Sequence, residues 1–174
     1  MVQDVLNAGS GSPQGKYSLT FAIAPPSAVR PGAVFTLPVI VAVRPVSAAN
    51  SDPLQQLGIT TLLRDETGAS AAVGLSGLAP ATVRSRAGNT ASGYANVGRL
   101  RIASPGKYRL RVVLIVNAAS GVTTEGYVDS GIIHVHAGAA ASQRPTSSQV
   151  LKLQTLIPEN IDISQADIAA WQQV

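Results

Sequence analysis

Few residues of this chain have the types and spacing that catalysis needs. The sequence contains two histidines and no cysteine, which excludes a thiolate nucleophile, a disulfide framework and any Cys-ligated zinc or iron–sulfur site. Residues 74–77 (Gly-Leu-Ser-Gly) lack the Gly-x-Ser-x-Gly pattern of a nucleophile elbow, and Asp65 and Glu66 precede a Thr-Gly pair that is typical of a loop tip. We therefore expect no enzyme, no cofactor and no small-molecule substrate.

The two histidines are the best candidate for a metal site. His134 and His136 are two residues apart, so in a strand both imidazoles point to the same face and can hold zinc or copper if a third ligand approaches. No cluster of acidic residues accompanies them in the sequence. We expect a solvated strand face here and no metal.

The charge is segregated along the chain. The formal net charge is +4 and the isoelectric point is near 9.9, yet no Asp or Glu occurs between Thr67 and Thr124. A segregated basic region can attract a polyanion or an acidic partner, and outward-facing strand positions can also carry Arg for solubility alone. Both interpretations stay open. The basic residues of this region are Arg84, Arg86, Arg99, Arg101, Lys107, Arg109 and Arg111.

Length and composition predict one folded domain with tails. Of the 174 residues 45% are apolar and 13% are charged, against about 25% charged in an average protein. Residues 1–16 are rich in Gly, Ser and Pro toward their end and predict a flexible N-terminal tail. Residues 17–163 form the predicted domain, and residues 164–174 a C-terminal helical tail. No apolar run is long enough to cross a bilayer, and the lack of a signal sequence and of cysteine favours a nuclear or cytoplasmic protein.

Short apolar runs, alternating with polar residues at 17–23 and 35–43, predict six or seven strands. Gly, Pro, Asn and Ser separate these runs, which is typical of a β-sandwich. Pro38 lies inside one run and indicates an edge strand or a break. Near the C-terminus, Ser147 and Ser148 are candidate helix caps before apolar residues at helical spacing. Residues 161–163 predict a short closing strand. The predicted strand segments are 17–23, 35–43, 57–63, 71–75, 97–102, 108–116 and 127–135.

The turn around Pro105 and Gly106 predicts how two strands are arranged. A tight hairpin there would place Arg101 beside Leu110, although cross-strand partners share one face of a sheet. The conflict disappears if the two strands belong to opposite sheets, joined by a corner like that between strands E and F of an immunoglobulin-like sandwich. In that arrangement Tyr108 is the corner tyrosine and bonds back to the upstream backbone.

Several segments then resemble one protein family. Residues 104–111 (Ser-Pro-Gly-Lys-Tyr-Arg-Leu-Arg) are similar to the "G-x-Y-R-L-R-F" strand of fungal velvet domains, after a Gly-hydrophobic strand at residues 93–102. Residues 128–135 resemble the family's "S-x-x-F-x-V" segment, and residues 146–163 its C-terminal helix and closing strand. Pro26, Arg30 and Gly32 are similar to its N-terminal "Q-P-x-R-A-R-x-C-G" segment. The family's basic "D-R-R-P" stretch is missing.

The resemblance implies a fold and a function. It implies an immunoglobulin-like β-sandwich related to the Rel homology domain, and a non-enzymatic nuclear regulator of transcription in fungal development and secondary metabolism. Such a protein pairs with itself or with another velvet-type protein and binds double-stranded DNA. The expected DNA contacts are Arg30, which keeps a family position, and Arg84 and Arg86, which stand in a basic loop before Ala-Gly-Asn. The alternative is a pure protein–protein interaction module that binds no DNA.

Overall fold

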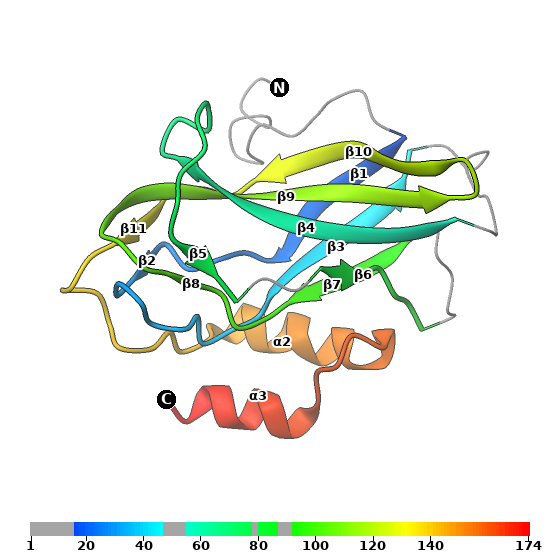
Figure 1. Cartoon of the computed structure of the whole chain (residues 1–174). Coiled ribbons are helices and arrows are strands. Elements are labelled where there is room, and N and C mark those ends of the chain that lie inside the picture. Colours follow the sequence, from blue (N-terminus) through cyan, green and yellow to red (C-terminus); the bar gives the residue numbers. More distant parts are fainter. Residues whose placement is uncertain (1–15, 47–54, 78–79, 87–91) are drawn as a thin grey trace, which may run out of the picture.

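A computed structural model describes residues 16–46, 55–77, 80–86 and 92–174 of the chain. The backbone of these residues is mostly β-strand, with two short α-helices toward the C-terminal end, so the expected all-β class with a C-terminal helix is confirmed at this level (Figure 1). The predicted tail at residues 1–16 lies outside the described residues, except for Lys16. The elements are β1 (Tyr17–Ile23), β2 (Ala28–Val29), β3 (Val39–Pro45), β4 (Gln56–Asp65), β5 (Leu75–Ser76), β6 (Ala81–Thr82), β7 (Gly93–Val97), β8 (Arg101–Ile102), β9 (Gly106–Ala118), β10 (Gly121–Asp129), β11 (Ile133–Val135), α2 (Ser147–Leu156), the 3-10 helix η2 (Ile157–Glu159) and α3 (Gln165–Gln172).

The strands form two larger sheets and one small one. The three-stranded sheet has the order β1-β3-β7, and the six-stranded sheet has the order β2-β11-β9-β4-β6 with β10 also paired to β9. Strands β5 and β8 form a separate two-stranded sheet. The long strand β9 organises the six-stranded sheet, because β4 pairs with it along ten residues while β11 and β10 share its other side.

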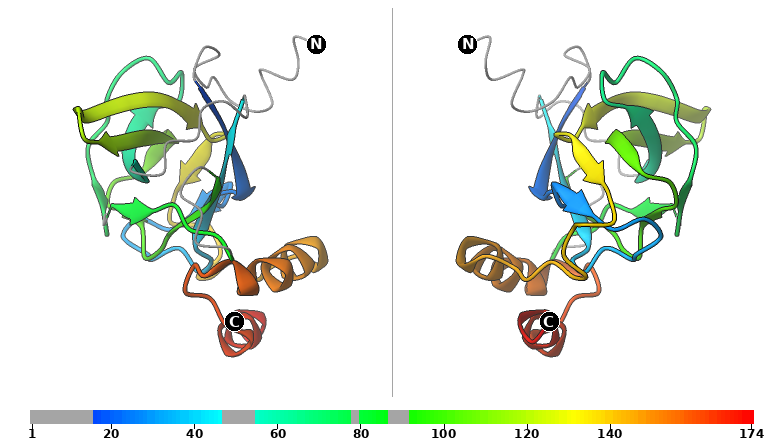
Figure 2. Two further views of the ribbon diagram at one scale, coloured as in Figure 1. Left: turned by 90° about the vertical axis from the view of Figure 1, so that its right-hand side faces the viewer. Right: turned by 90° about the vertical axis from the view of Figure 1, so that its left-hand side faces the viewer.

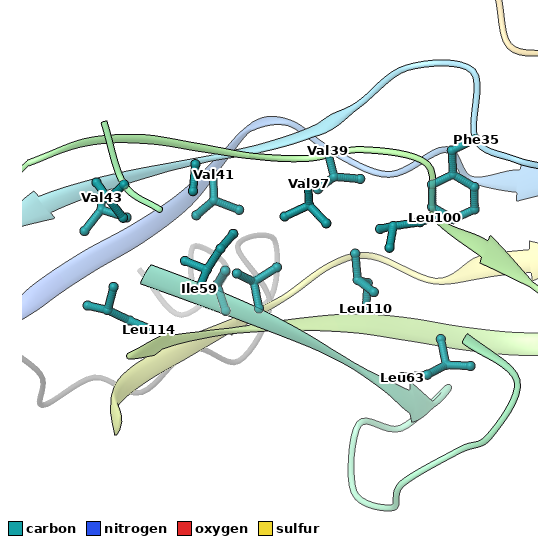
Figure 3. Close-up of a cluster of buried hydrophobic side chains, with 14 of the residues drawn as sticks. Phe35, Val39, Val41, Val43, Ile59, Leu63, Val97, Leu100, Leu110 and Leu114 are labelled. Carbon is teal, nitrogen blue, oxygen red and sulfur yellow. The ribbon is translucent and has the colours of Figure 1, made fainter. Parts of the chain in front are cut away.

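The main core lies between the two larger sheets. Strand β4 shows why, since its residues alternate between buried and more exposed positions along almost its whole length. Figure 3 shows Ile59 and Leu63 of β4, with Leu110 and Leu114 of β9, facing the valines of the other sheet. Burying apolar side chains from both sheets against one another is the main stabilising contribution to this fold. The valines labelled there are Val39, Val41, Val43 and Val97.

A second apolar cluster joins the helices to the three-stranded sheet. Leu153 and Leu156 of α2 and Ile168 of α3 are fully buried against Ile23 and Ile40. In Figures 1 and 2 both helices lie on one side of the strands, with α2 closer to them than α3. Both faces of β3 are thereby covered, which explains why Val39 to Val43 include consecutive buried residues.

The structure corrects two local predictions and decides between the two alternatives at Pro38. The segment 161–163 is not a strand, because Asn160 and Asp162 adopt φ of +70° and +63°, which turns the chain away from an extended path. The cap of α2 is Thr146, whose side chain accepts a hydrogen bond from the Gln149 N–H; Ser147 and Ser148 are already helical. Pro38 marks a break, because β3 begins at the next residue and is the central strand of its sheet.

Two predicted strands are much shorter than their apolar runs. Of residues 71–75 only the last belongs to β5, and of residues 97–102 the middle forms a turn between β7 and β8. Arg99 lies in that turn with φ of +58°. Leu100 in the same segment is buried although its backbone is not part of a strand.

The arrangement around Tyr108 is confirmed in part, because the strand before the turn lies in the small β5-β8 sheet and not in the three-stranded sheet opposite β9. Strand β8 pairs with β5 and not with β9, so the segments before and after Pro105-Gly106 belong to different sheets. The Tyr108 hydroxyl lies 3.0 Å from the carbonyl oxygen of Ser104 and 3.2 Å from that of Pro105, the backward bond expected of a corner tyrosine.

Candidate binding surface

The three arginines expected to contact DNA lie at opposite edges of the six-stranded sheet. Arg30 directly follows β2, and Arg84 and Arg86 follow β6. Strands β2 and β6 are the two ends of the five-strand order, and Figure 1 shows them at opposite ends of the sheet. The structure therefore does not bring the three side chains together.

Arg84 and Arg86 are paired with acidic residues near the C-terminus. A guanidinium nitrogen of Arg84 lies 3.8 Å from the carboxylate of Asp162, and one of Arg86 lies 3.5 Å from that of Glu159. The Arg86 N–H also donates to Glu159 at 3.1 Å. Exposed pairs of this kind contribute little stability, about 0–1 kcal/mol each. Their effect here is local neutralisation of the charge that a polyanion would otherwise meet.

Arg30 belongs to a different group of basic residues, which we call the cationic corner: Arg30, Lys107, His134 and His136. Lys107 is the cross-strand partner of His134. His134 also lies beside Ala28, and the His136 N–H donates to the Val29 carbonyl, so the parallel register places Arg30 next to His136. Val29 and Val135 point into the core, and the four polar side chains are on the outer face.

The two imidazoles lie on one face, as the sequence predicted. Their ring centroids are 4.3 Å apart, at an interplanar angle of 37°. Within the described ranges no group of three His, Cys, Asp or Glu residues is placed to hold a metal ion. The Arg30 Nε donates to the Ala139 carbonyl oxygen at 2.7 Å, which ties its guanidinium to the segment that follows β11.

Arg109 and Arg111 do not project freely into solvent, contrary to the simplest interpretation of the basic region. Arg109 donates from Nε to the Glu66 carbonyl at 2.7 Å, and Arg111 donates to the Gly68 carbonyl at 3.1 Å. Arg64, which lies directly opposite Arg109 on β4, also donates to Gly68. Like charges opposite one another destabilise a sheet, and the loop carbonyls offset that repulsion. These three arginines thus hold the loop after β4 against the outer face.

The same loop is closed by Asp65. Its carboxylate accepts hydrogen bonds from the Thr67 hydroxyl at 2.6 Å and from the Thr67 and Ala69 N–H groups. These bonds, that from the Thr67 hydroxyl above all, lower the pKa of Asp65 below its ordinary value of 3.8. The carboxylate therefore stabilises the turn, in agreement with the loop tip expected from the sequence.

The other half of the outer face is apolar. We define the apolar strip as Leu62, Val113, Ile115, Val122 and Tyr127, which the register of β4, β9 and β10 places on one side of the sheet. Leu62 is 45% exposed and Val122 is 65% exposed, whereas the inward-facing residues at the centres of β4 and β9 are buried. A groove of about 460 Å³ continues from Ile115 toward β6 and is lined by Gly58, Thr60, Pro80 and Ala81.

The apolar run at residues 112–116 was a sequence signal for this strip, but composition alone did not show which of its residues face outward. Residues 112–116 are all apolar, so the run has no period-2 alternation to distinguish a core face from an outer face. The pairing of β9 with β4 and β10 shows which face each residue occupies. An uninterrupted apolar strand indicates that both faces are suited to contact, and here the second face has no covering element within the described chain.

Searches of protein-family models and of curated proteins gave no match for this chain. Among the described helices, neither α2 nor α3 is long and apolar enough to span a membrane.

Proposed function

We propose that the chain is an immunoglobulin-like β-sandwich of the velvet type, related to the Rel homology domain. The support comes from the same residues that carry the sequence resemblance. Gly106 to Arg111 contain the family-like motif and form the start of β9, directly after the corner that Tyr108 closes. Two sheets that share one core, followed by C-terminal helices, agree with this type.

Its proposed role is that of a non-enzymatic regulator of transcription that works through protein pairing. The observation that carries the pairing is the apolar strip, which presents large apolar side chains from three adjacent strands on an outer sheet face. Adjacent exposed apolar side chains are typical of interaction sites, and an interface between like chains is more apolar than the rest of a surface. The proposed partner is a second copy of the chain or another velvet-type protein.

The test is the oligomeric state of the purified chain. We expect a concentration-dependent dimer in analytical ultracentrifugation, alone or after mixing with a velvet-type protein. Each of Leu62→Gln and Val122→Gln should weaken it about tenfold or more, because each removes the burial of a large apolar side chain. Val73→Gln is the matched control, since Val73 is 85% exposed outside the strip. A chain that stays monomeric with and without the partner, or an equal loss with the control, contradicts the proposal.

DNA binding through Arg30, Arg84 and Arg86 has less support than pairing. Arg84 and Arg86 are neutralised by Asp162 and Glu159 and lie away from Arg30. We expect duplex DNA, titrated by fluorescence anisotropy at low and moderate salt, to show no affinity that depends on Arg84 and Arg86. Binding that weakens steeply with salt and is lost in Arg84→Ala/Arg86→Ala would instead favour the DNA-linked regulator. Transcription regulation rests on the resemblance, and nuclear or cytoplasmic placement stays an expectation from the sequence.

A further inference from the structure

The cationic corner is compact and lies at one end of the outer sheet face. Its four side chains come from three adjacent strands or their ends, and the pairing of β11 with β2 and β9 fixes their relative positions. The two imidazole centroids are 4.3 Å apart, so the ring nitrogens can donate to a single small group. Hydrogen bonding to the Ala139 carbonyl holds Arg30 through Nε, which leaves both terminal guanidinium nitrogens for another acceptor.

The groups that face the imidazoles are cationic or neutral. Arg30 follows β2 on one side, and Lys107 belongs to β9 on the other. Arg109, two residues further along β9, is turned toward the carbonyls of Glu66 and Ser130. Within the described part of the chain no carboxylate forms an ion pair with any of the four corner residues. The corner therefore gathers N–H donors and positive charge with no acidic counterpart.

We propose that the cationic corner binds one phosphate group, carried by a phosphorylated segment of a partner protein, and that protonation of His134 and His136 strengthens this binding. Arg and Lys recognise phosphate through charge-assisted hydrogen bonds, and protonated imidazoles add further N–H donors and charge. The corner suits a single phosphate better than a nucleic-acid backbone, because the cations that would extend it, Arg84 and Arg86, lie beyond the opposite edge of the sheet.

The corner and the apolar strip occupy the same outer face of the six-stranded sheet. Lys107 begins the outward-facing row of β9 that continues through Arg109 and Arg111 to Val113 and Ile115. A partner seated on the strip can therefore reach the corner with its own chain. The proposal that a protein segment carries the phosphate rests on the proposed pairing function. The proposed anion site does not depend on that function.

The anion site is tested by titrating inorganic sulfate into the chain and following the imidazole C–H resonances of both histidines by NMR. Sulfate keeps its charge of −2 between pH 5.5 and 7.5, so any pH effect comes from the protein. We expect a saturable shift whose affinity rises about tenfold from pH 7.5 to 5.5, the effect of about one added charge-assisted hydrogen bond. The absence of a saturable shift, or an affinity that does not rise, overturns the proposal.

Variants distinguish specific sulfate binding at the cationic corner from general electrostatic attraction. Arg30→Gln should weaken sulfate binding about tenfold, and His134→Gln/His136→Gln, followed through backbone amides, should remove the pH dependence. Lys152→Gln is the matched control, because Lys152 is an exposed cation on α2, outside the sheet. An equal loss of affinity in Lys152→Gln means unspecific attraction and overturns the site.

The source of the phosphate is tested with two further probes. A mixed-sequence peptide with one phosphoserine should bind at least tenfold more tightly than its unphosphorylated form, and the gain should vanish in Arg30→Gln. A 20-base-pair DNA duplex should bind with no steep salt dependence. If the duplex binds tightly with a salt slope of several phosphates, and Arg30→Gln removes this binding, the corner is a nucleic-acid contact and the assignment to a protein segment is wrong. These readouts do not depend on dimer formation, so failure here is distinct from failure of the pairing.

Discussion

Arg111 and Asp129 lie opposite each other on β9 and β10 and form a two-point ion pair, with Nε 2.7 Å from Oδ1 and a terminal nitrogen 2.8 Å from Oδ2. Their side chains are only 15% and 3% exposed. The hydrogen bond to Asp129 raises the pKa of Arg111 above its ordinary value, and the guanidinium also stacks 3.9 Å from the ring centroid of Tyr127. The pair connects the edge strand β10, the long strand β9 and the loop after β4.

Replacing Asp129 by Asn should destabilise the fold strongly. The substitution leaves the largely buried guanidinium of Arg111 without its counter-charge, and breaking such a pair costs about 3–5 kcal/mol. The free energy of unfolding measured in urea should fall by about that amount. Glu125→Gln on the same strand is the control and should change it by less than about 0.5 kcal/mol. A small effect of Asp129→Asn would mean that water or the loop carbonyls replace the carboxylate.

Removing the Tyr108 hydroxyl should loosen the corner between β8 and β9. Tyr108→Phe keeps the ring but removes the donor to the carbonyls of Ser104 and Pro105. We expect a loss of about 1 kcal/mol in the free energy of unfolding. Tyr127→Phe is the matched control, because its ring packs on Arg111 and the described structure gives its hydroxyl no hydrogen bond. Equal losses in both variants would contradict a specific role of the corner bond.

Adding a methyl group at Gly77 should distort the small sheet. A Cβ there would lie 1.9 Å from the Arg99 carbonyl oxygen, a backbone atom, at a φ of +84°. Gly32→Ala is the comparison, since its φ is +74° with open space around the new Cβ. Gly32→Ala should cost about 1–2 kcal/mol from backbone strain alone, and Gly77→Ala distinctly more, measured as a lower Tm. Similar Tm values for both variants would argue against the close approach of Arg99.

Protonation of Asp65 at low pH should weaken the turn after β4. Because the folded pKa of Asp65 lies below its ordinary value of 3.8, its ionised form adds stability above that pH, and this contribution is lost as the pH falls through the folded pKa. The unfolding free energy of the wild type should therefore decrease more between pH 5 and 2 than that of Asp65→Asn. Parallel pH profiles would show that the Thr67 hydroxyl bond contributes nothing to folding.

Local patterns predicted the strands whose two faces differ in burial. The apolar run at residues 57–63 corresponds to β4, and the alternation at residues 17–23 corresponds to β1, because a half-buried strand favours apolar residues on its inner face. Tyr108 was predicted because a conflict between Arg101 and Leu110 excluded a simple hairpin. The prediction of a strand at residues 161–163 was wrong. Its two isoleucines are buried in the helical cluster although the backbone there is not extended, and apolar spacing alone does not exclude that arrangement.

The sequence by itself determined the all-β class and the single basic region, since these follow from residue types and local spacing. Only the tertiary structure decided which cations act together. Arg30 joins residues more than 70 positions away through the pairing of β2, β11 and β9, while Arg84 and Arg86 meet Asp162 and Glu159. Contacts between residues far apart in the sequence depend on strand order and register, which are set by the packing of the whole core and by no segment alone.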